Sequence, residues 1–403
     1  MDSVHAVRAM VPLAAVALLL SGCGLAAATD PGGPSAGVDT AKKTVEIGAF
    51  VPETGPVPSY KLIAEGARAY IDWVNANGGV NGYKINYTQL DDGYDPARSL
   101  ADAKQLVEQS HVLALVAPIG TPTNAAVQPY AVAQKLPVVG AVGGSPDMAQ
   151  QDNYFVLLPN YHDEAHLDVS YGVDELGKKR IAVLYENDDL GKPALEGAKA
   201  AAQEKGVKVV ATAAFNVSDT DLTAQITQAK NAGADLTVVW GSNSNVATAV
   251  TTAKRLGFDT QFFAPFYTAD PSTYKLAGSA LDDTLFGSWL LPTSDDSPSV
   301  RAYNEQMKAD GHGDDIGVFS LNGWTNAALF AAGLDKATKN GEEPTRESLI
   351  AALSTFDGVA VGATPSVTFT PGDHVGTRSL SIIKATGGDF TTVTSKPIPL
   401  GSK

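Results

Sequence analysis

Two short clusters of histidine and acidic residues are the first places where this sequence could hold a metal ion. In HDEAH, His162 and His166 stand one helical turn apart with Glu164 between them, a spacing that suits a metal pair. The cluster also suits an ordinary helix start, because Asp163 and Glu164 favour the positive end of the helix dipole. We expect the helix start, with both histidines on its solvated face and no metal.

The second cluster, DDGYDP at Asp91–Pro96, has acidic residues spaced as in a calcium loop. It lacks the twelve-residue length and the terminal glutamate that such a loop requires. Asp95 stands directly before Pro96, where it predicts a helix cap with proline at the first helical position. We therefore expect no calcium site here.

No motif of covalent or metal-dependent catalysis occurs in the chain. The patterns G-x-S-x-G, H-E-x-x-H, C-x-x-C and G-x-x-x-x-G-K-[ST] are all absent. The loop in GAFVPETGPVPSYKL, residues 48–62, is rich in glycine and proline, but its prolines remove the N–H groups that a phosphate nest needs. We predict a binding protein that is not an enzyme and uses no cofactor; a metal-dependent hydrolase is the weaker alternative.

Length, composition and charge set the broad class. At 403 residues with 44% hydrophobic residues, the chain is globular and too long for one ordinary core, so two domains are expected. The net charge of -15 repels phosphate backbones, which argues against a nucleic-acid partner.

Short apolar runs alternate with amphipathic segments along most of the chain, which predicts parallel sheets covered by helices on both faces. The expected strands are 44–51, 83–90, 112–118 and 136–142 in a first set, and 180–186, 207–215, 234–241 and 261–267 in a second. The expected helices are 60–77, 96–108 and 124–134, then 195–205, 221–232 and 246–256.

The segment from residue 294 is too short and irregular for a third sheet domain. It contains three helix patterns, at 300–309, 321–337 and 346–353, and two strand patterns, at 366–370 and 379–385. We expect it to complete the first two domains, so that the chain crosses between them more than once.

The N-terminus reads as an export signal. A weakly basic start and a short apolar run lead to Leu20-Ser21-Gly22-Cys23, which resembles a bacterial lipobox with the only cysteine of the chain as the lipidated residue. We predict a signal peptide over 1–22, lipidation of Cys23, and a flexible tether over 23–43 that is rich in glycine, proline and small residues. The predicted location is the outer face of the cell membrane.

The sequence resembles one protein family. TGPVPSYKLIAEGARAYIDWVNANGGVNGYKINYTQLDDGYDPARSLADAKQLV is similar to the N-terminal lobe of the leucine/isoleucine/valine-type substrate-binding proteins of bacterial ABC importers. RIAVLYENDDLGK and RLGFDTQFFAPF are similar to parts of the second lobe. The resemblance implies a periplasmic binding protein type 1 fold: two doubly wound parallel-sheet lobes, joined by three crossovers, that close over a small molecule.

The resemblance also implies the lobes and the loops that meet at the ligand. Lobe 1 would comprise 44–160 and 290–372, and lobe 2 would comprise 161–289 and 373–398. Ligands of such sheets lie beyond the carboxyl ends of the strands. The loops there are 52–60, 118–123 and 141–146 from lobe 1, and 186–191, 240–245 and 265–269 from lobe 2.

In lobe 1 the resemblance implies that Tyr60 packs on the ligand and that Gly120 and Thr121 hold its carboxylate. Thr121 would cap the following helix, leaving free N–H groups aimed at an anion. The loop that holds an ammonium group in the family matches Val142-Gly143-Gly144-Ser145. Gly144 stands where the family has a hydroxyl, so Ser145 would have to substitute.

Lobe 2 departs further from the family pattern. Leu190 replaces an aromatic residue, and Phe266 replaces the acidic residue that neutralises an ammonium group. A buried ammonium ion without a carboxylate costs several kcal/mol. The remaining expected contacts are Trp240, Ser242, Tyr161 and Tyr267.

These departures favour a small branched-chain or aromatic carboxylate that need not carry an amine. Asp188 or Asp189 could still serve an amine, so a branched-chain or other hydrophobic amino acid is the alternative ligand. We expect a monomer that docks on ABC transporter permease subunits; a ligand sensor is a further alternative.

Replacing Cys23 with serine removes the thiol that would accept the lipid, so the Cys23→Ser protein should leave the membrane fraction for the soluble one. Cell fractionation with immunoblotting measures this. A variant that stays in the membrane fraction would contradict lipid anchoring at this residue.

Overall fold

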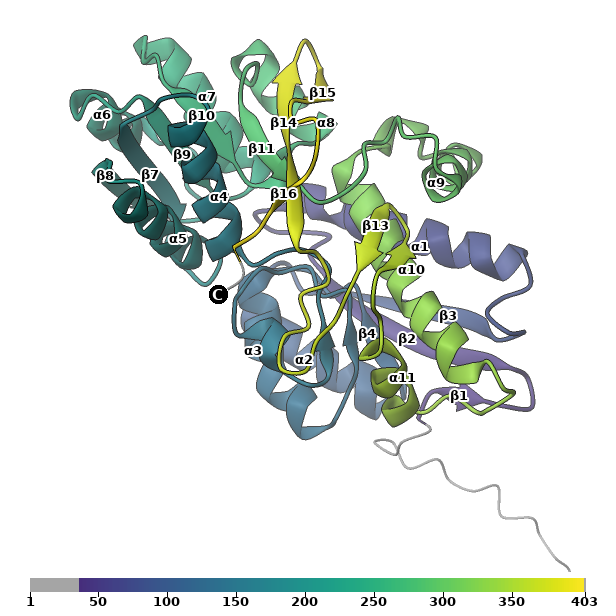
Figure 1. Ribbon diagram of the computed structural model, residues 1–403. Helices are drawn as coiled ribbons and strands as arrows, with labels where there is room; N and C mark the ends of the chain where they lie inside the picture. The colour runs from purple at the N-terminus through teal and green to yellow at the C-terminus, as the bar shows by residue number, and fades with distance from the viewer. Residues whose placement is uncertain (1–35, 402–403) are drawn as a thin grey trace, which may run out of the picture.

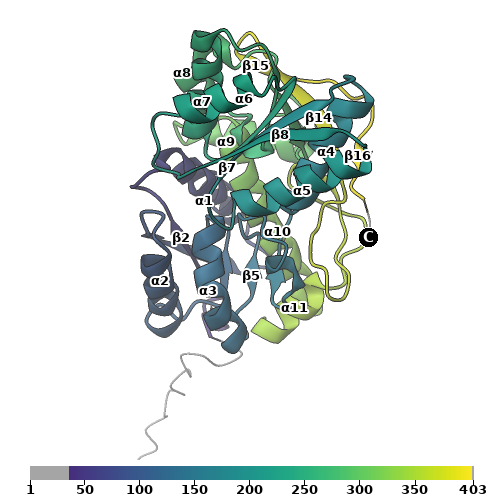
Figure 2. The same cartoon turned by 90° about the vertical axis from the view of Figure 1, so that its left-hand side faces the viewer.

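Residues 36–401 are described by a computed structural model, and they form two α/β lobes, one above the other in Figure 2. The predicted pair of helix-covered parallel sheets is confirmed. The predicted signal peptide and Cys23 lie outside the described residues. Within the described part of the chain, every helix is too short or too polar to cross a membrane.

Lobe 1 is built on a six-stranded sheet that is parallel except at one edge. β2 runs parallel to β3 over its whole length, from Thr44 beside Lys84 to Val51 beside Asp91. The strands are β1 (Val38–Asp39), β2 (Thr44–Val51), β3 (Lys84–Asp91), β4 (Ala114–Val116), β5 (Val138–Val139) and β6 (Tyr154–Phe155). The helices are α1 (Lys61–Ala76), α2 (Pro96–Glu108), α3 (Thr121–Ala133), α9 (Pro298–Ala309), α10 (Val318–Thr338) and α11 (Arg346–Leu353), with a hairpin of β12 (Val359–Val361) and β13 (Thr364–Val367).

Lobe 2 has an eight-stranded sheet whose first strands are parallel and whose C-terminal strands are antiparallel. Its strands are β7 (Arg180–Glu186), β8 (Lys208–Phe215), β9 (Leu236–Trp240), β10 (Gln261–Ala264), β11 (Leu285–Ser288), β14 (Ser379–Thr386), β15 (Asp389–Thr392) and β16 (Ile398–Pro399). Its helices are α4 (Tyr161–Asp174), α5 (Gly191–Glu204), α6 (Thr223–Asn231), α7 (Asn243–Leu256) and α8 (Pro271–Ala277).

The alternation of side chains along β7 explains how helices cover both faces of this sheet. Ile181 and Val183 belong to a core shared with α4 and α5, whereas Ala182 and Leu184 belong to a core with α6 and α7. Successive side chains of a strand point to opposite faces, so an unbroken apolar run such as IAVL requires cover on both sides.

Local signals explain where several helices begin and end. The Asp95 carboxylate accepts hydrogen bonds from the N–H groups of Ala97 and Arg98, which confirms the predicted cap of α2. At α7, Ser242 and Asn245 form a reciprocal capping box, and Gly257 ends the helix in the left-handed conformation at φ 60°.

The chain passes between the lobes three times: after β6, between β11 and α9, and between β13 and β14 (Figure 1). The lobe boundary drawn after residue 372 is a few residues too early. His374 N donates to Ala149 O and Gly376 N donates to Val156 O, so this segment still pairs with lobe 1.

The predicted flexible tether over 23–43 is wrong at its C-terminal end. Val38 and Asp39 form β1, antiparallel to the start of β2, and Ala36 is buried. The Gly37 carbonyl accepts a hydrogen bond from Glu46 N. Small residues let this segment lie close against the sheet, which composition alone does not distinguish from a linker.

Two glycines allow α1 and α10 to touch backbone to backbone in the core of lobe 1. A Cβ atom at Gly66 would lie 1.8 Å from the Ser320 carbonyl oxygen, and one at Gly323 would lie 1.7 Å from that of Ile63. Neither contact can be relieved by moving a side chain, so the two helices must have glycine at these positions.

We expect Gly323→Ala to lower the free energy of unfolding by several kcal/mol, because the two helices must separate to admit the methyl group. Chemical denaturation measures the change. The matched control is Gly333→Ala on the same helix, whose added Cβ would meet only the leucine side chains of α11 at 2.8 Å and beyond. Equal destabilisation of the two variants would contradict a backbone clash as the cause.

Candidate functional site

A small cavity with about 20 Å³ of free space lies between the lobes, at the carboxyl ends of their parallel strands. The walls come from both lobes and are nearly all apolar or aromatic. The lining residues are Tyr60, Ile63, Tyr94, Ile119, Gly120, Thr121, Val142 and Phe319 from lobe 1, and Tyr161, Leu190 and Tyr267 from lobe 2. Ligand pockets commonly measure about 300–1,000 Å³, so the lobes leave almost no free space here and must separate for a ligand to bind between them.

Aromatic rings from the two lobes meet across the cavity. The ring centroid of Tyr60 lies 6.3 Å from that of Tyr267 in the opposite lobe, 6.0 Å from Tyr94 and 5.3 Å from Phe319. Tyr161 lies 6.0 Å from Tyr267. Tyr60 and Tyr267 are each only 5% exposed, so the cleft is closed and excludes water.

The rim loop that leads to Tyr60 is fastened by Asp91. One Asp91 oxygen accepts hydrogen bonds from the N–H groups of Glu53, Thr54 and Gly93, and the other accepts one from the Thr54 hydroxyl. The Asp91 carboxylate therefore holds the loop in place, and these hydrogen bonds lower its pKa against the opposing effect of burial.

The N-terminus of α3 forms a polar part of the lobe 1 wall. The prediction that Thr121 caps this helix is wrong by one residue: Gly120 is the N-cap, at φ 110°, a conformation that favours glycine. Thr121 is instead the first helical residue, and its buried Oγ1 makes no hydrogen bond of standard geometry, although the Tyr161 hydroxyl interacts with it. Pro122 has no N–H group, and Asn124 N donates to Gly120 O. The N–H groups of Thr121 and Thr123 are therefore the ones in this turn that remain available to an anion.

Glu186, the last residue of β7, places a carboxyl group beside the cavity from lobe 2. It is 2% exposed, and its Oε1 has no hydrogen-bond partner among the described residues. Burial, together with the nearby Asp188, raises the pKa of Glu186 to about 9. Burial is the main cause of the raised pKa values of Tyr60, Tyr94 and Tyr267, and the ionised form of Glu186 adds to each of them. Glu186 therefore lies within electrostatic range of the aromatic walls.

Phe266 forms the layer behind Tyr267 and does not line the cavity. Its ring lies 5.6 Å from Tyr267 and 5.5 Å from Trp289, and its N–H donates to Glu164 Oε1 at 2.8 Å. Glu164 and Asp168 are a fully buried pair on α4, and burial raises the pKa of both. A protonated acid thus supports the loop that carries Phe266 and Tyr267.

Seven of the thirteen residues expected at the ligand line the cavity: Tyr60, Gly120, Thr121, Val142, Tyr161, Leu190 and Tyr267. The others lie one layer behind it or beside it: Gly143, Gly144, Ser145, Trp240, Ser242 and Phe266. Gly144 serves packing, because a Cβ there would lie 2.5 Å from the Tyr161 ring. Ser242 caps α7, and Trp240 packs on Tyr161 at 5.7 Å.

Five residues beside the cavity were missed by sequence reasoning: Ile63, Tyr94, Ile119, Phe319 and Glu186. Ile63 follows Tyr60 by one helical turn, a spacing that could have identified it. Tyr94 has a left-handed backbone conformation at φ 63°, and no sequence pattern predicted this conformation. Phe319 lies in the first turn of α10, two residues before the predicted helix at 321–337, and Glu186 ends a predicted strand.

The two histidines of HDEAH behave as predicted for a helix start. Asn160 caps α4, and Asp163 and Glu164 lie in its first turn. His162 Nδ1 lies 2.9 Å from Asp163, and His166 Nε2 lies 3.1 Å from Glu204.

Among the described residues, the group whose ligand atoms come close enough for a metal ion lies elsewhere, at Glu65, His312 and Asp315, and is partly exposed. His312 Nδ1 lies 3.1 Å from Asp315 and 3.6 Å from Glu65, so ion pairing explains the group.

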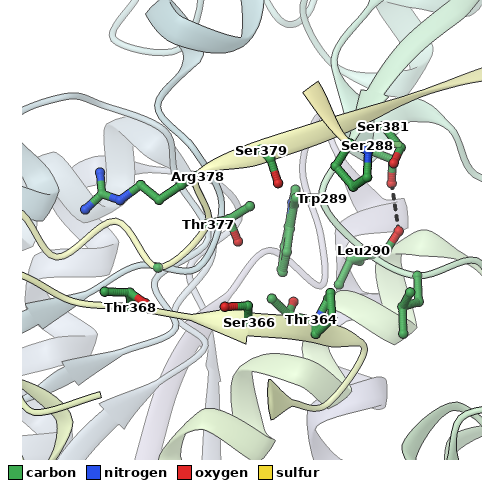
Figure 3. A pocket seen from close by; sticks show the side chains of 14 residues that line it. Ser288, Trp289, Leu290, Thr364, Ser366, Thr368, Thr377, Arg378, Ser379 and Ser381 are labelled. Carbon is green, nitrogen blue, oxygen red and sulfur yellow. Dashed lines mark hydrogen bonds between the residues drawn. The ribbon is translucent and has the colours of Figure 1, made fainter. Parts of the chain in front are cut away.

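A second cavity, with about 260 Å³ of free space, lies among the crossover segments (Figure 3). Hydroxyl groups of serine and threonine dominate its walls, with Trp289 between them. The Thr364 and Thr377 hydroxyls and the Trp289 Nε1 are buried without hydrogen-bond partners among the described residues. Such groups are commonly satisfied by water. Although Ser288 ends the parallel strand β11, most of the lining belongs to the crossover segments, so the cleft between the strand ends of both lobes is the better ligand site.

Comparisons with known proteins agree with this geometry. The model of the periplasmic binding protein family matches residues 44–389. A leucine-, isoleucine-, valine-, threonine- and alanine-binding protein of Pseudomonas aeruginosa is 25% identical over 321 residues, which cover 79% of this chain and 84% of that protein. A Leu/Ile/Val-binding protein homologue of Brucella suis is 27% identical over 293 residues, 71% of this chain and 77% of that protein.

Solved structures share the fold. A branched-chain amino acid ABC transporter protein from Thermus thermophilus with bound valine has a TM-score of 0.82 at 22% identity, covering 89% of this chain and 97% of that one. A fatty acid ABC transporter substrate-binding protein from Thermomonospora curvata also has a TM-score of 0.82, at 23% identity, covering 91% and 95%. The fold is that of binding proteins rather than enzymes, and the chain belongs to the periplasmic binding protein family.

Proposed function

We propose that this protein is the exported substrate-binding component of an ABC importer and that it captures a small hydrophobic amino acid. The observation that carries the proposal is a closed, largely apolar cavity with a helix N-terminus on one wall and, beside the other, a buried carboxyl group with one oxygen free of hydrogen bonds among the described residues. Relatives described as amino-acid-binding proteins support the same ligand class.

The carboxylate of the ligand would bind at the first turn of α3. Free N–H groups and the positive end of the helix dipole favour an anion there, and the Thr121 hydroxyl can donate a further hydrogen bond. The apolar side chain would lie among Tyr60, Tyr161, Tyr267 and Phe319, where each well-buried apolar group contributes about 1.5–3 kcal/mol.

Glu186 would neutralise the ammonium group and so fill the role that Phe266 cannot. Its carboxyl group has an unused oxygen, is buried, and lies within electrostatic range of the tyrosines that line the cavity. In the empty cleft the raised pKa keeps this group protonated at neutral pH, whereas an ammonium ion beside it would favour the ionised form. Binding an amine should therefore release a proton.

A small branched-chain or aromatic carboxylate without an amine is the second candidate. It is favoured by the apolar Phe266 in the family's acidic position and by the protonated state of Glu186, which could donate a hydrogen bond to a neutral oxygen. Such a ligand would bind without releasing a proton, which separates the two candidates.

Leucine and 4-methylpentanoate, which differ only by the amine, provide the test. We expect calorimetric titration to show tighter binding of leucine, and Glu186→Gln to weaken leucine binding by roughly 10- to 100-fold, as when one partner of a buried charge pair is removed. The affinity for 4-methylpentanoate should change little. The control is Glu196→Gln, which removes an exposed carboxylate of α5.

The affinity for leucine should also rise with pH between about 6.5 and 8.5. In this range the ligand-free Glu186, with its pKa raised to about 9, still holds the proton that the bound form gives up. Titration in buffers of different ionisation enthalpy measures the proton release. Equal binding of the two compounds by the wild type favours the second candidate, and a thermal-shift screen of amino acids and organic acids without any stabilisation contradicts ligand capture altogether.

A further inference from the structure

Asp270 connects the two lobes through two different helices. It follows β10 of lobe 2 and is 2% exposed. Its Oδ1 accepts a hydrogen bond from Ser272 N at 2.9 Å, which caps α8 of its own lobe. Its Oδ2 accepts one from Phe319 N at 3.1 Å, in the first turn of α10 in lobe 1.

Helix α10 has no cap of its own at this end. Its N-cap residue is Gly317, which offers no side chain, and its first turn contains no acidic residue. The first N–H groups of a helix need acceptors, and a carboxylate there also interacts favourably with the helix dipole. From the opposite lobe, Asp270 provides both a hydrogen-bond acceptor for this end of α10 and a negative charge near the helix dipole.

This contact exists only while the lobes are together, because the acceptor belongs to lobe 2 and the donor to lobe 1. A second hydrogen bond between the lobes, from Asn243 Nδ2 to Ser59 Oγ at 3.3 Å, is longer and joins uncharged groups. Charge-assisted hydrogen bonds are roughly twice as strong as neutral ones, so the Asp270 contact is the stronger of these two. Phe319 also packs on Tyr60 in the cavity wall, which links the contact to the ligand site.

We propose that Asp270 is a positioning residue that stabilises the closed cleft by capping α10 of the opposite lobe. The proposal rests on the proposed function only in that the cleft must open to admit a ligand. Asparagine replaces one of the two carboxylate oxygens with an NH2 group, which is a donor and cannot accept an N–H, so in this geometry Asp270→Asn loses the contact with either Ser272 N or Phe319 N.

The test compares Asp270→Asn with wild type in a Cys23→Ser background, which is free of other cysteines. Spin labels on cysteines at Ala97 and Lys192, exposed residues in the first turns of α2 and α5, report the distance between the lobes. We expect the distance distribution of the variant to shift toward longer values without ligand, and its leucine affinity to fall roughly 10-fold.

Gly317→Ala is the second variant, which leaves both carboxylate oxygens in place. Its backbone, at φ -174°, accepts any residue, but the added Cβ would lie 2.4 Å from Asp270 Oδ2. It should therefore open the cleft as Asp270→Asn does. The matched control is Asp221→Asn, which removes a carboxylate that accepts from Thr223 N at 2.8 Å within lobe 2 alone. Its distance distribution should equal that of the wild type.

Longer distances in both test variants, with the control unchanged, support the proposal. Unchanged distributions in Asp270→Asn and Gly317→Ala, both without ligand and with saturating leucine, overturn it. If leucine fails to bind the wild type, the proposed ligand class is wrong, but the ligand-free distributions still decide whether Asp270 holds the lobes together.

Discussion

When the cleft closes, polar groups at the interface lose their hydrogen bonds to water, and their own lobe does not offer replacement partners. The need for such partners determines how the site is arranged. A buried donor or acceptor without a partner costs free energy, so each such group must find a partner in the other lobe or in the ligand. The N–H groups at the start of α10 find theirs in Asp270. The Thr121 hydroxyl and Glu186 Oε1 do not find one of standard geometry among the described residues. A ligand that forms hydrogen bonds with these two groups gains the most binding free energy.

Local patterns were sufficient for most of the fold. The strand at 44–51 has the predicted bounds because it is one continuous, largely apolar run. The helix at 96–108 also has the predicted bounds, and its start is marked by the Asp95 cap and the proline that follows. Short elements such as β11 and α8 were missed, since a four-residue strand in LFGS carries no periodicity.

The site was predicted less completely because it depends on contacts between distant segments. Tyr60 and Thr121 were found through a resemblance that is local in sequence. Phe319 and Glu186 lie at the ends of elements that look like core, and only the docking of the lobes brings them to the cavity. The misplaced cap at Thr121 has a local cause: the positive φ of Gly120 moves the helix start by one residue.

Because of the buried acids of lobe 2, the folded protein binds more protons at neutral pH than the unfolded chain does. Glu164, Asp168 and Glu186 all have raised pKa values through burial, so at neutral pH the molecule is less negative than the formal charge of -15. Unfolding exposes these groups to water, where their pKa values return to about 4 and their protons are released. Because the folded state binds the extra protons, its stability is greatest below the unfolded pKa values and is lost as pH rises through the folded ones. Through these three acids, the folded state is stabilised more in acid than in alkali.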